Sequence, residues 1–306
     1  MPQELIVSSS PHIRVKESTH SVMRDVIIAL LLPLGFSIYF FGWYTFLVCL
    51  VSVTVCVLTE FLFEKVIKKK STVGDMSAVV TGLLFAFVIP PTIPLWLVVI
   101  GAMVSIILGK QIFGGLGHNP FNPALVGRAV LTASWPVYMT TWVRPFDAVT
   151  SASPLGIVKE GLDHTLPSYM DMFIGNRAGS LGETSVFALL IGALYLLYRK
   201  QISWHIPITY VSTVAIISVL FNKDPLFNIL AGGLILGAFF MATDMVTTPI
   251  TKKGQLVFGF GCGFFTAFIR FTGGFPEGVC YSILIMNMFT PLIDKYTQPR
   301  RFGLVK

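Results

Sequence analysis

Side chains that could do chemistry gather in the middle of an otherwise apolar chain, in the stretch RPFDAVTSASPLG from Arg144 to Gly156. The stretch holds a carboxylate, three hydroxyl groups and a following proline: Asp147, Thr150, Ser151, Ser153 and Pro154. Such residues form turns and helix caps by bonding their side-chain oxygens to nearby backbone amides. By residue type alone, the stretch favours turn and capping chemistry, with Pro154 ending and stiffening the exposed segment.

A second block, GGLGHNPFNP, runs from Gly114 to Pro123 and cannot continue a helix. At membrane depth, such backbone survives only where it is buried in protein or lines a cavity. We therefore expect a broken or re-entrant segment beside a ligand site. Asn119 and Asn122 would hydrogen-bond the polar edge of the ligand, while Gly114 and Gly115 allow its close approach. A purely structural re-entrant loop explains the block equally well.

Arg128 follows this block inside an apolar segment. A charge near the centre of a bilayer costs roughly 2.5 to 3.5 kcal/mol even on the lenient insertion scale, so Arg128 needs a partner. Glu60 and Asp244 are the candidate carboxylates. The alternative is that the Arg128 side chain extends to the membrane surface.

Three further oxygen-bearing residues, Glu60, Asp244 and Thr247, define a possible ion path. Asp244 lies among threonines whose oxygens suit a hard cation such as sodium. Each acid also fits a plain helix-end position exposed to lipid headgroups. We expect no metal site, because the four cysteines show no CxxC pairing and His118 has no second ligand at helical spacing.

The elements that position these residues must be membrane helices. Hydrophobic residues make up 54% of the chain and charged residues only 12%, against about a quarter in soluble domains. Apolar runs near the roughly 20-residue length of a bilayer crossing recur about ten times. They cover residues 26–42, 43–63, 76–90, 92–112, 123–137, 184–197, 203–221, 226–245, 255–271 and 278–292. The predicted fold is an all-α integral membrane protein.

Lysine and arginine set the expected orientation, because cytoplasmic loops hold them in excess. With both termini cytoplasmic, every inner loop is basic. The net charge of +7 therefore reflects membrane orientation. We expect a lipid bilayer and no nucleic acid as partner. The expected parts are a cytoplasmic segment 1–25, a five-helix repeat 26–137, an outer loop 138–183, a second five-helix repeat 184–293 and a cytoplasmic tail 294–306.

Five crossings in each half imply that the two repeats insert with opposite orientation. Gly114-Gly115-Leu116 precedes the fifth crossing from inside, and Gly273-Gly274-Phe275 precedes the tenth from outside. A secondary transporter of inverted-repeat type, without a bound redox cofactor, shares this pattern. A passive scaffold for partner subunits would not need an intramembrane arginine.

Several long blocks resemble one family, the NqrB/RnfD family of membrane subunits, and above all its RnfD members from the Rnf complex. They are Ser9–Ile13, Gly114–Arg128, Met241–Pro249 and Gly273–Val279, and the resemblance spans essentially the whole chain. It implies a membrane subunit of a bacterial or archaeal cytoplasmic-membrane complex that passes electrons from reduced ferredoxin to NAD and exports sodium ions or protons. The implied partners are the other components of the Rnf complex, RnfA, RnfB, RnfC, RnfE and RnfG.

The same resemblance implies two flavins. Asp147 to Ser153 resembles the signature Asp-x-x-Ser/Thr-Gly-Ala-Ser/Thr, at which a flavin transferase links FMN through its phosphate. Ser151 stands for the usual glycine, Ala152 matches, and the acceptor becomes Ser153, with Thr150 the fallback. Serine is chemically competent for a phosphoester, and the loop would lie on the outer face.

A non-covalent riboflavin is the second flavin. Its expected contacts are Gly114, Gly115, Asn119, Asn122 and Arg128, and an anionic reduced flavin would be a further partner for Arg128.

Overall fold

The computed structural model describes residues 18–67, 72–146, 150–161, 166–274 and 277–299. Asp147 lies outside the described residues, as do most of the expected segment 1–25 and the end of the expected tail 294–306. Most of the described part is helical, and its two strands are short. In chain order the elements are α1 (Thr19–Phe41), α2 (Trp43–Val66), the 3-10 helix η1 (Val73–Asp75), α3 (Ser77–Phe87), α4 (Leu95–Ile106), the π-helix η2 (Ile107–Gln111), α5 (Pro123–Ser134), α6 (Pro136–Thr140), β1 (Trp142–Val143), β2 (Thr150–Ser151), α7 (Pro154–Glu160), α8 (Tyr169–Ile174), the 3-10 helix η3 (Leu181–Glu183), α9 (Val186–Tyr198), α10 (His205–Leu220), α11 (Pro225–Leu230), α12 (Leu234–Leu236), the π-helix η4 (Gly237–Met241), α13 (Lys252–Thr272) and α14 (Val279–Thr297).

Three of the described helices, α1, α2 and α13, are long and apolar enough to cross a membrane by themselves. Gly42 separates α1 from α2 in a turn with φ of 81°, a conformation that glycine adopts without strain. Shorter apolar helices accompany them at 77–87, 95–111, 186–198 and 205–220. The described part is therefore consistent with the expected all-α, multi-pass membrane protein.

The helices depart from the expected crossings where glycine and proline interrupt the apolar runs. The run 226–245 forms no single helix, because the chain leaves helical geometry after Leu230 and Gly232 takes a φ of 66°. The run 76–90 yields the short helix α3, which ends before Pro90 and Pro91. Both π-helices, η2 and η4, directly precede non-helical segments, 112–122 and 242–251.

Small residues let the long helices pack closely, as is usual in membranes. A Cβ added at Gly259 of α13 would lie 2.8 Å from the carbonyl oxygen of Ile206 in α10. A Cβ at Gly82 of α3 would lie 2.7 Å from the Cα of Val53 in α2. These contacts join α10 to α13 and α2 to α3.

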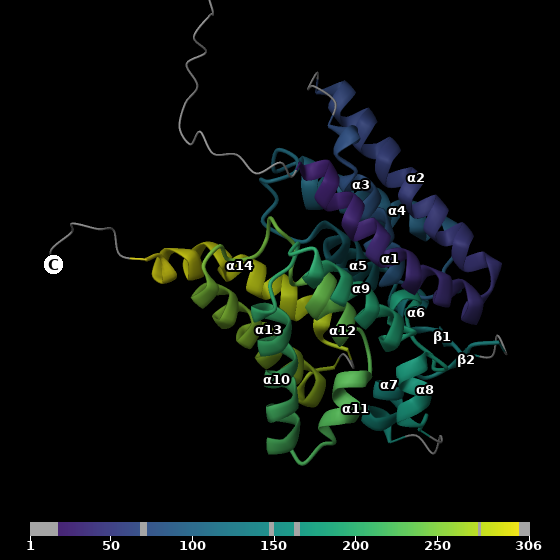
Figure 1. Ribbon diagram of the computed structural model, residues 1–306. Helices are drawn as coiled ribbons and strands as arrows, with labels where there is room; N and C mark the ends of the chain where they lie inside the picture. Colours follow the sequence, from purple (N-terminus) through teal and green to yellow (C-terminus); the bar gives the residue numbers. More distant parts are fainter. Residues whose placement is uncertain (1–17, 68–71, 147–149, 162–165, 275–276, 300–306) are drawn as a thin grey trace, which may run out of the picture.

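The short elements β1, β2, α7 and α8 lie at one end of the helix bundle, together with α11 (Figure 1). We call this the hairpin end. Phe146 N donates to the carbonyl oxygen of Phe40, which ties this end to the last turn of α1. The first turns of α1 lie at the opposite end, where Asp25 pairs with Arg199 at the end of α9.

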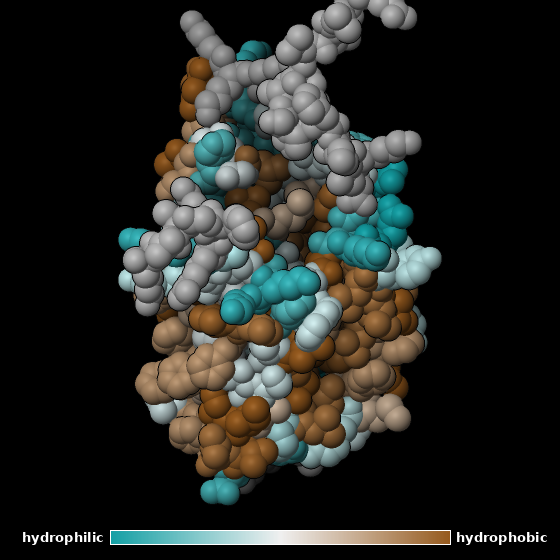
Figure 2. All heavy atoms as spheres, turned by 60° about the vertical axis from the view of Figure 1, so that its left-hand side comes forward, coloured by the Kyte–Doolittle hydropathy of each residue, from teal (hydrophilic) through white to brown (hydrophobic). Residues whose placement is uncertain are grey.

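Apolar side chains also cover much of the outside. Figure 2 shows hydrophobic residues over broad stretches of one face, with hydrophilic residues gathered in smaller patches. Large exposed hydrophobic residues occur on the long helices, among them Leu31, Leu58, Leu62 and Phe268. Such a surface is stable in contact with lipid and would aggregate in water.

Candidate functional site

Ser153 begins helix α7 as its N-cap. Its Oγ accepts a hydrogen bond from Gly156 N at 3.2 Å, and Pro154 takes the first helical position, where a backbone N–H is not needed. The turn-and-cap interpretation of this stretch is therefore confirmed for Ser153. The Ser153 residue is 7% exposed, whereas Thr150 in β2 is exposed.

Ser153 also lines a cavity of about 320 Å³ at the hairpin end, which we call the Ser153 cavity. Four separate parts of the chain form it: α5, the β1 region, the start of α7 and the residues around the start of α14. Its lining includes Arg128, Thr132, Trp142, Ala152, Gly156, Gly274, Glu277 and Tyr281. Thr150 is not among the lining residues, and Ser151 and Pro154 line a neighbouring cavity of about 380 Å³.

Helix α5 carries Arg128 to this cavity. Asn122 caps the helix by accepting from Ala124 N and Leu125 N at 3.1 and 3.3 Å, and Pro123 begins it. Gly127 brings α5 against α4, since a Cβ there would lie 2.7 Å from the carbonyl oxygen of Gly101. This close contact fixes the position of Arg128, the next residue.

Arg128 does not pair with Glu60 or Asp244 as expected. Its Nη2 donates to Glu277, and its Nη1 lies 3.7 Å from Glu183 Oε1. The expectation was wrong because it placed Arg128 near the inner part of the molecule, whereas α5 runs toward the hairpin end. Burial raises the pKa of Glu277, and the positive charge of Arg128 opposes this rise.

Two more buried arginines, Arg177 and Arg270, donate hydrogen bonds to the broken segment between α11 and α12. Arg177 donates to the carbonyl oxygens of Leu230 and Glu183. Arg270 donates from Nη1 to the carbonyl oxygen of Asn228 at 2.6 Å, and from Nε to that of Glu277 at 2.9 Å. We call Arg128, Arg177, Arg270, Glu183 and Glu277 the arginine cluster. Where the helix is interrupted, its last carbonyl groups have no backbone N–H partner, and the guanidinium groups donate to them instead.

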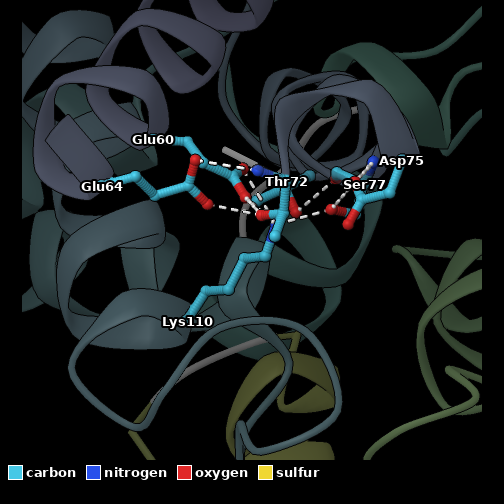
Figure 3. A network of polar contacts seen from close by, with 7 residues as sticks. Glu60, Glu64, Thr72, Asp75, Ser77 and Lys110 are labelled. Atoms are coloured by element: carbon cyan, nitrogen blue, oxygen red, sulfur yellow. Dashed lines mark hydrogen bonds and ion pairs between the residues drawn. The ribbon is translucent and has the colours of Figure 1, made fainter. Parts of the chain in front are cut away.

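A separate buried network surrounds Lys110 of η2, and Figure 3 shows its members converging. The ammonium group of Lys110 donates to both oxygens of Glu60, at 2.6 and 2.8 Å, and to Ser77 Oγ at 2.5 Å. Lys110 and Glu60 are at most 1% exposed. Ser77 Oγ in turn donates a hydrogen bond to Asp75. Thr72 Oγ1 donates to Glu60 and Glu64. The carboxylate of Glu60 is therefore paired with the side-chain ammonium group of Lys110.

The residues expected around a second flavin are only partly brought together. Asn119 and Asn122 line a cavity of about 70 Å³ with Lys110 and Asp244, which we call the Asn122 cavity. Arg128 is not part of it, and neither are Gly114 and Gly115, although both glycines adopt positive φ, 123° and 101°. Asn119 Oδ1 is buried and makes no hydrogen bond within the described residues.

Asp244 and Thr247 remain neighbours, but Glu60 belongs to a different network. Thr247 Oγ1 donates to Asp244 Oδ2 at 3.2 Å. Asp244 reaches the Asn122 cavity, while Thr247 is absent from its lining. Among the described residues, no group of three or more His, Cys, Asp or Glu side chains has the geometry to hold a metal ion.

Sequence reasoning missed Glu183, Glu277 and Lys110 as members of the buried networks. Glu277 stands inside the block Gly273–Val279, so its position was visible although its partner was not. Lys110 stands four residues before Gly114, and by the orientation rule a lysine there indicates an inner-loop charge. The π-helix turns it inward instead, and such bulges are frequent at functional sites.

Comparisons with known proteins match this chain along almost its full length. The model of the NQR2, RnfD, RnfE family matches residues 6–303. A subunit of the proton-translocating ferredoxin:NAD(+) oxidoreductase complex of Clostridium ljungdahlii is 48% identical, over 97% of this chain and 96% of the relative. A subunit of the Na(+)-translocating ferredoxin:NAD(+) oxidoreductase complex of Acetobacterium woodii is 49% identical, over 99% and 96%. A subunit of the ion-translocating oxidoreductase complex of Vibrio cholerae is 38% identical, over 97% and 99%. The chain belongs to the NQR2, RnfD, RnfE family.

Proposed function

We propose that this protein is the RnfD component of an ion-translocating ferredoxin:NAD+ oxidoreductase complex. The observation that carries the proposal is full-length similarity, at 48 and 49% identity, to two relatives named for that activity. Its partners are then the other components of the complex, namely RnfA, RnfB, RnfC, RnfE and RnfG. The two relatives are named for different ions, protons and sodium, so similarity favours neither ion for this chain.

The proposed membrane arrangement has about ten crossings in two inverted five-helix repeats. The long apolar helices α1, α2 and α13 and the shorter apolar helices between α2 and α13 support several crossings, and the inverted repeat itself rests on the sequence pattern. Both termini would be cytoplasmic and the hairpin end would face outward. The Lys110 network would then lie toward the cytoplasm and the arginine cluster toward the outside.

Ser153 is the proposed attachment point of a covalent FMN, placed there during maturation by a flavin transferase. The residues around it fit such a group, because Ser153 opens on a cavity of about 320 Å³, within the roughly 300 to 1,000 Å³ typical of ligand sites. Trp142 and Tyr281 supply aromatic walls, and Arg128 supplies a positive charge. A flavin bound there would accept and pass on electrons. The chain itself supplies Oγ for the phosphoester and forms the cavity from four segments.

Exchange of the two candidate hydroxyls tests this attachment. The full chain is expressed with a flavin transferase as wild type, Ser153→Ala, Ser153→Thr and Thr150→Ala, and flavin fluorescence is read in the denatured gel band. We expect fluorescence in the wild type, Ser153→Thr and Thr150→Ala, and none in Ser153→Ala. A fluorescent Ser153→Ala band together with a dark Thr150→Ala band would move the attachment to Thr150. A dark wild-type band, with the transferase active on a control, would refute the covalent flavin.

The proposed riboflavin does not fit the Asn122 cavity in this structure. The volume of the Asn122 cavity, about 70 Å³, is well below the roughly 300 Å³ of small ligand pockets. The riboflavin proposal therefore rests on the resemblance alone. Denaturing the purified protein and measuring free flavin in the supernatant tests it: one riboflavin per chain is expected, and flavin only in the protein pellet would contradict it.

Of the proposed ion-path residues, Asp244 is the one that the structure favours. Its carboxylate reaches a cavity of water size beside the buried, unbonded Asn119 Oδ1, whereas Glu60 is held by Lys110. Asp244→Asn is expected to slow ion transport by the complex more than it slows ferredoxin oxidation. Equal loss of both rates would assign Asp244 a structural role.

A further inference from the structure

The buried charges around the Ser153 cavity do not balance among the described residues. The arginine cluster contains three arginines and two glutamates, and Glu160 at the cavity rim is exposed to solvent. An excess positive charge in a buried site is costly unless an anion compensates it. The cluster therefore favours a group that is, or becomes, negatively charged.

Arg128 is the arginine of this cluster that faces the cavity. Arg177 and Arg270 each donate to several backbone carbonyl groups and hold the break between α11 and α12. Arg128 is held by carboxylates instead, closely by Glu277 and loosely by Glu183 at 3.7 Å. Arg128 and Glu277 both line the Ser153 cavity, so a group attached at Ser153 shares the cavity with one ion pair.

We propose that the Arg128–Glu277 ion pair sets the reduction potential of the flavin held in the Ser153 cavity. This inference rests on the proposed covalent FMN. On gaining an electron, the flavin gains negative charge, which the guanidinium group of Arg128 stabilises. The carboxylate of Glu277 neutralises part of that guanidinium charge and so limits the effect. The pair acts by its charge and takes no part in bond making.

The signs of the two effects are opposite, which makes the pair testable. Glu277→Gln keeps the size of the side chain and removes its negative charge, so the flavin becomes easier to reduce. Arg128→Gln removes the positive charge, so the flavin becomes harder to reduce. We expect each change to shift the reduction equilibrium at least tenfold, about 59 mV for one electron. Arg128→Lys keeps the charge and is expected to stay nearer the wild-type potential than Arg128→Gln.

The measurement is a spectroelectrochemical titration of the full chain carrying its covalent flavin. Lys223→Gln is the matched control, because Lys223 is an exposed cation outside the Ser153 cavity. The flavin of this variant is expected to have the same reduction potential as that of the wild type. Opposite shifts in Glu277→Gln and Arg128→Gln support the inference. If Arg128→Gln fails to accumulate, the Glu277→Gln shift alone decides.

Fluorescence of the denatured gel band separates failure of this inference from failure of the proposed function. A labelled band whose potential is unchanged in Glu277→Gln overturns the role of the ion pair and leaves the attached flavin standing. An unlabelled wild-type band overturns the proposed covalent flavin, and the inference with it.

Discussion

Two buried cations organise the polar groups of this membrane protein at the scale of single residues. Lys110 holds Glu60 and Ser77 near one end, and Arg128 holds Glu277 at the other. In each case the carboxylate partner comes from a distant part of the chain, 50 residues away for Lys110 and 149 for Arg128. Buried charges persist only when paired, so these pairs constrain how the helices assemble.

Loss of Lys110 is expected to destabilise the protein strongly. Lys110→Met would leave Glu60 buried and unpaired, at a cost of about 3 to 5 kcal/mol. The double change Lys110→Met with Glu60→Gln removes both charges and is expected to cost less than the single change. Thermal unfolding in detergent measures this, with Lys295→Met on the exposed part of α14 as control. Equal melting temperatures for Lys110→Met and the control would show that the pair contributes nothing.

Part of this residue-scale picture could be predicted from the sequence. The need of Arg128 for a partner follows from the cost of its burial, and the capping role of Ser153 follows from its position before Pro154. The identity of the partner could not be predicted, because Glu277 reaches Arg128 only after α5, α13 and α14 have packed together. Local sequence patterns do not show which residues of such distant segments come into contact.

Close helix contacts position the site at the scale of elements. Gly127 sits where α5 meets α4, and a Cβ there would lie 1.9 Å from Ser105 Oγ as well as 2.7 Å from a backbone oxygen. The interruptions matter as much as the helices. Within the non-helical segment 112–122, the part from Gly114 onward was predicted from its glycines, prolines and asparagines. The break after Leu230 was not, because Ala231-Gly232-Gly233 lies in an apolar run and is held open by Arg177 and Arg270.

A pair of matched glycine substitutions tests the packing of α5. Gly127→Ala forces α5 away from α4 and is expected to cost about 1 to 3 kcal/mol. Gly35→Ala lies on α1 with nothing within 4 Å of its added Cβ, and is expected to stabilise by up to about 1 kcal/mol through helix propensity. Melting temperatures in detergent compare the two. Equal effects of both changes would contradict the proposed close contact.

The whole molecule divides its charges between two ends of an apolar bundle. The hairpin end carries the Ser153 cavity and the arginine cluster, and the opposite end carries Asp25 with Arg199. Composition and apolar runs were enough to predict a multi-pass membrane protein. They were not enough to give helix ends or the pairing of helices, since both depend on contacts such as Gly259 against Ile206.

Cysteine labelling tests the orientation of these ends. The four native cysteines are buried, so single introduced cysteines report with little background. In intact cells, a membrane-impermeant thiol reagent is expected to label Lys223→Cys at the hairpin end. Lys253→Cys at the start of α13 is expected to react only after the membrane is permeabilised. The reverse pattern would invert the proposed topology.

The central claim is that the hairpin end holds a flavin covalently at Ser153, and peptide mapping by mass spectrometry tests it most directly. The wild-type chain, purified with its partner subunits and digested, should give a peptide covering Ser153 that carries the added mass of FMN, with fragment ions placing that mass on Ser153. A complete digest in which this peptide appears only unmodified would contradict the claim.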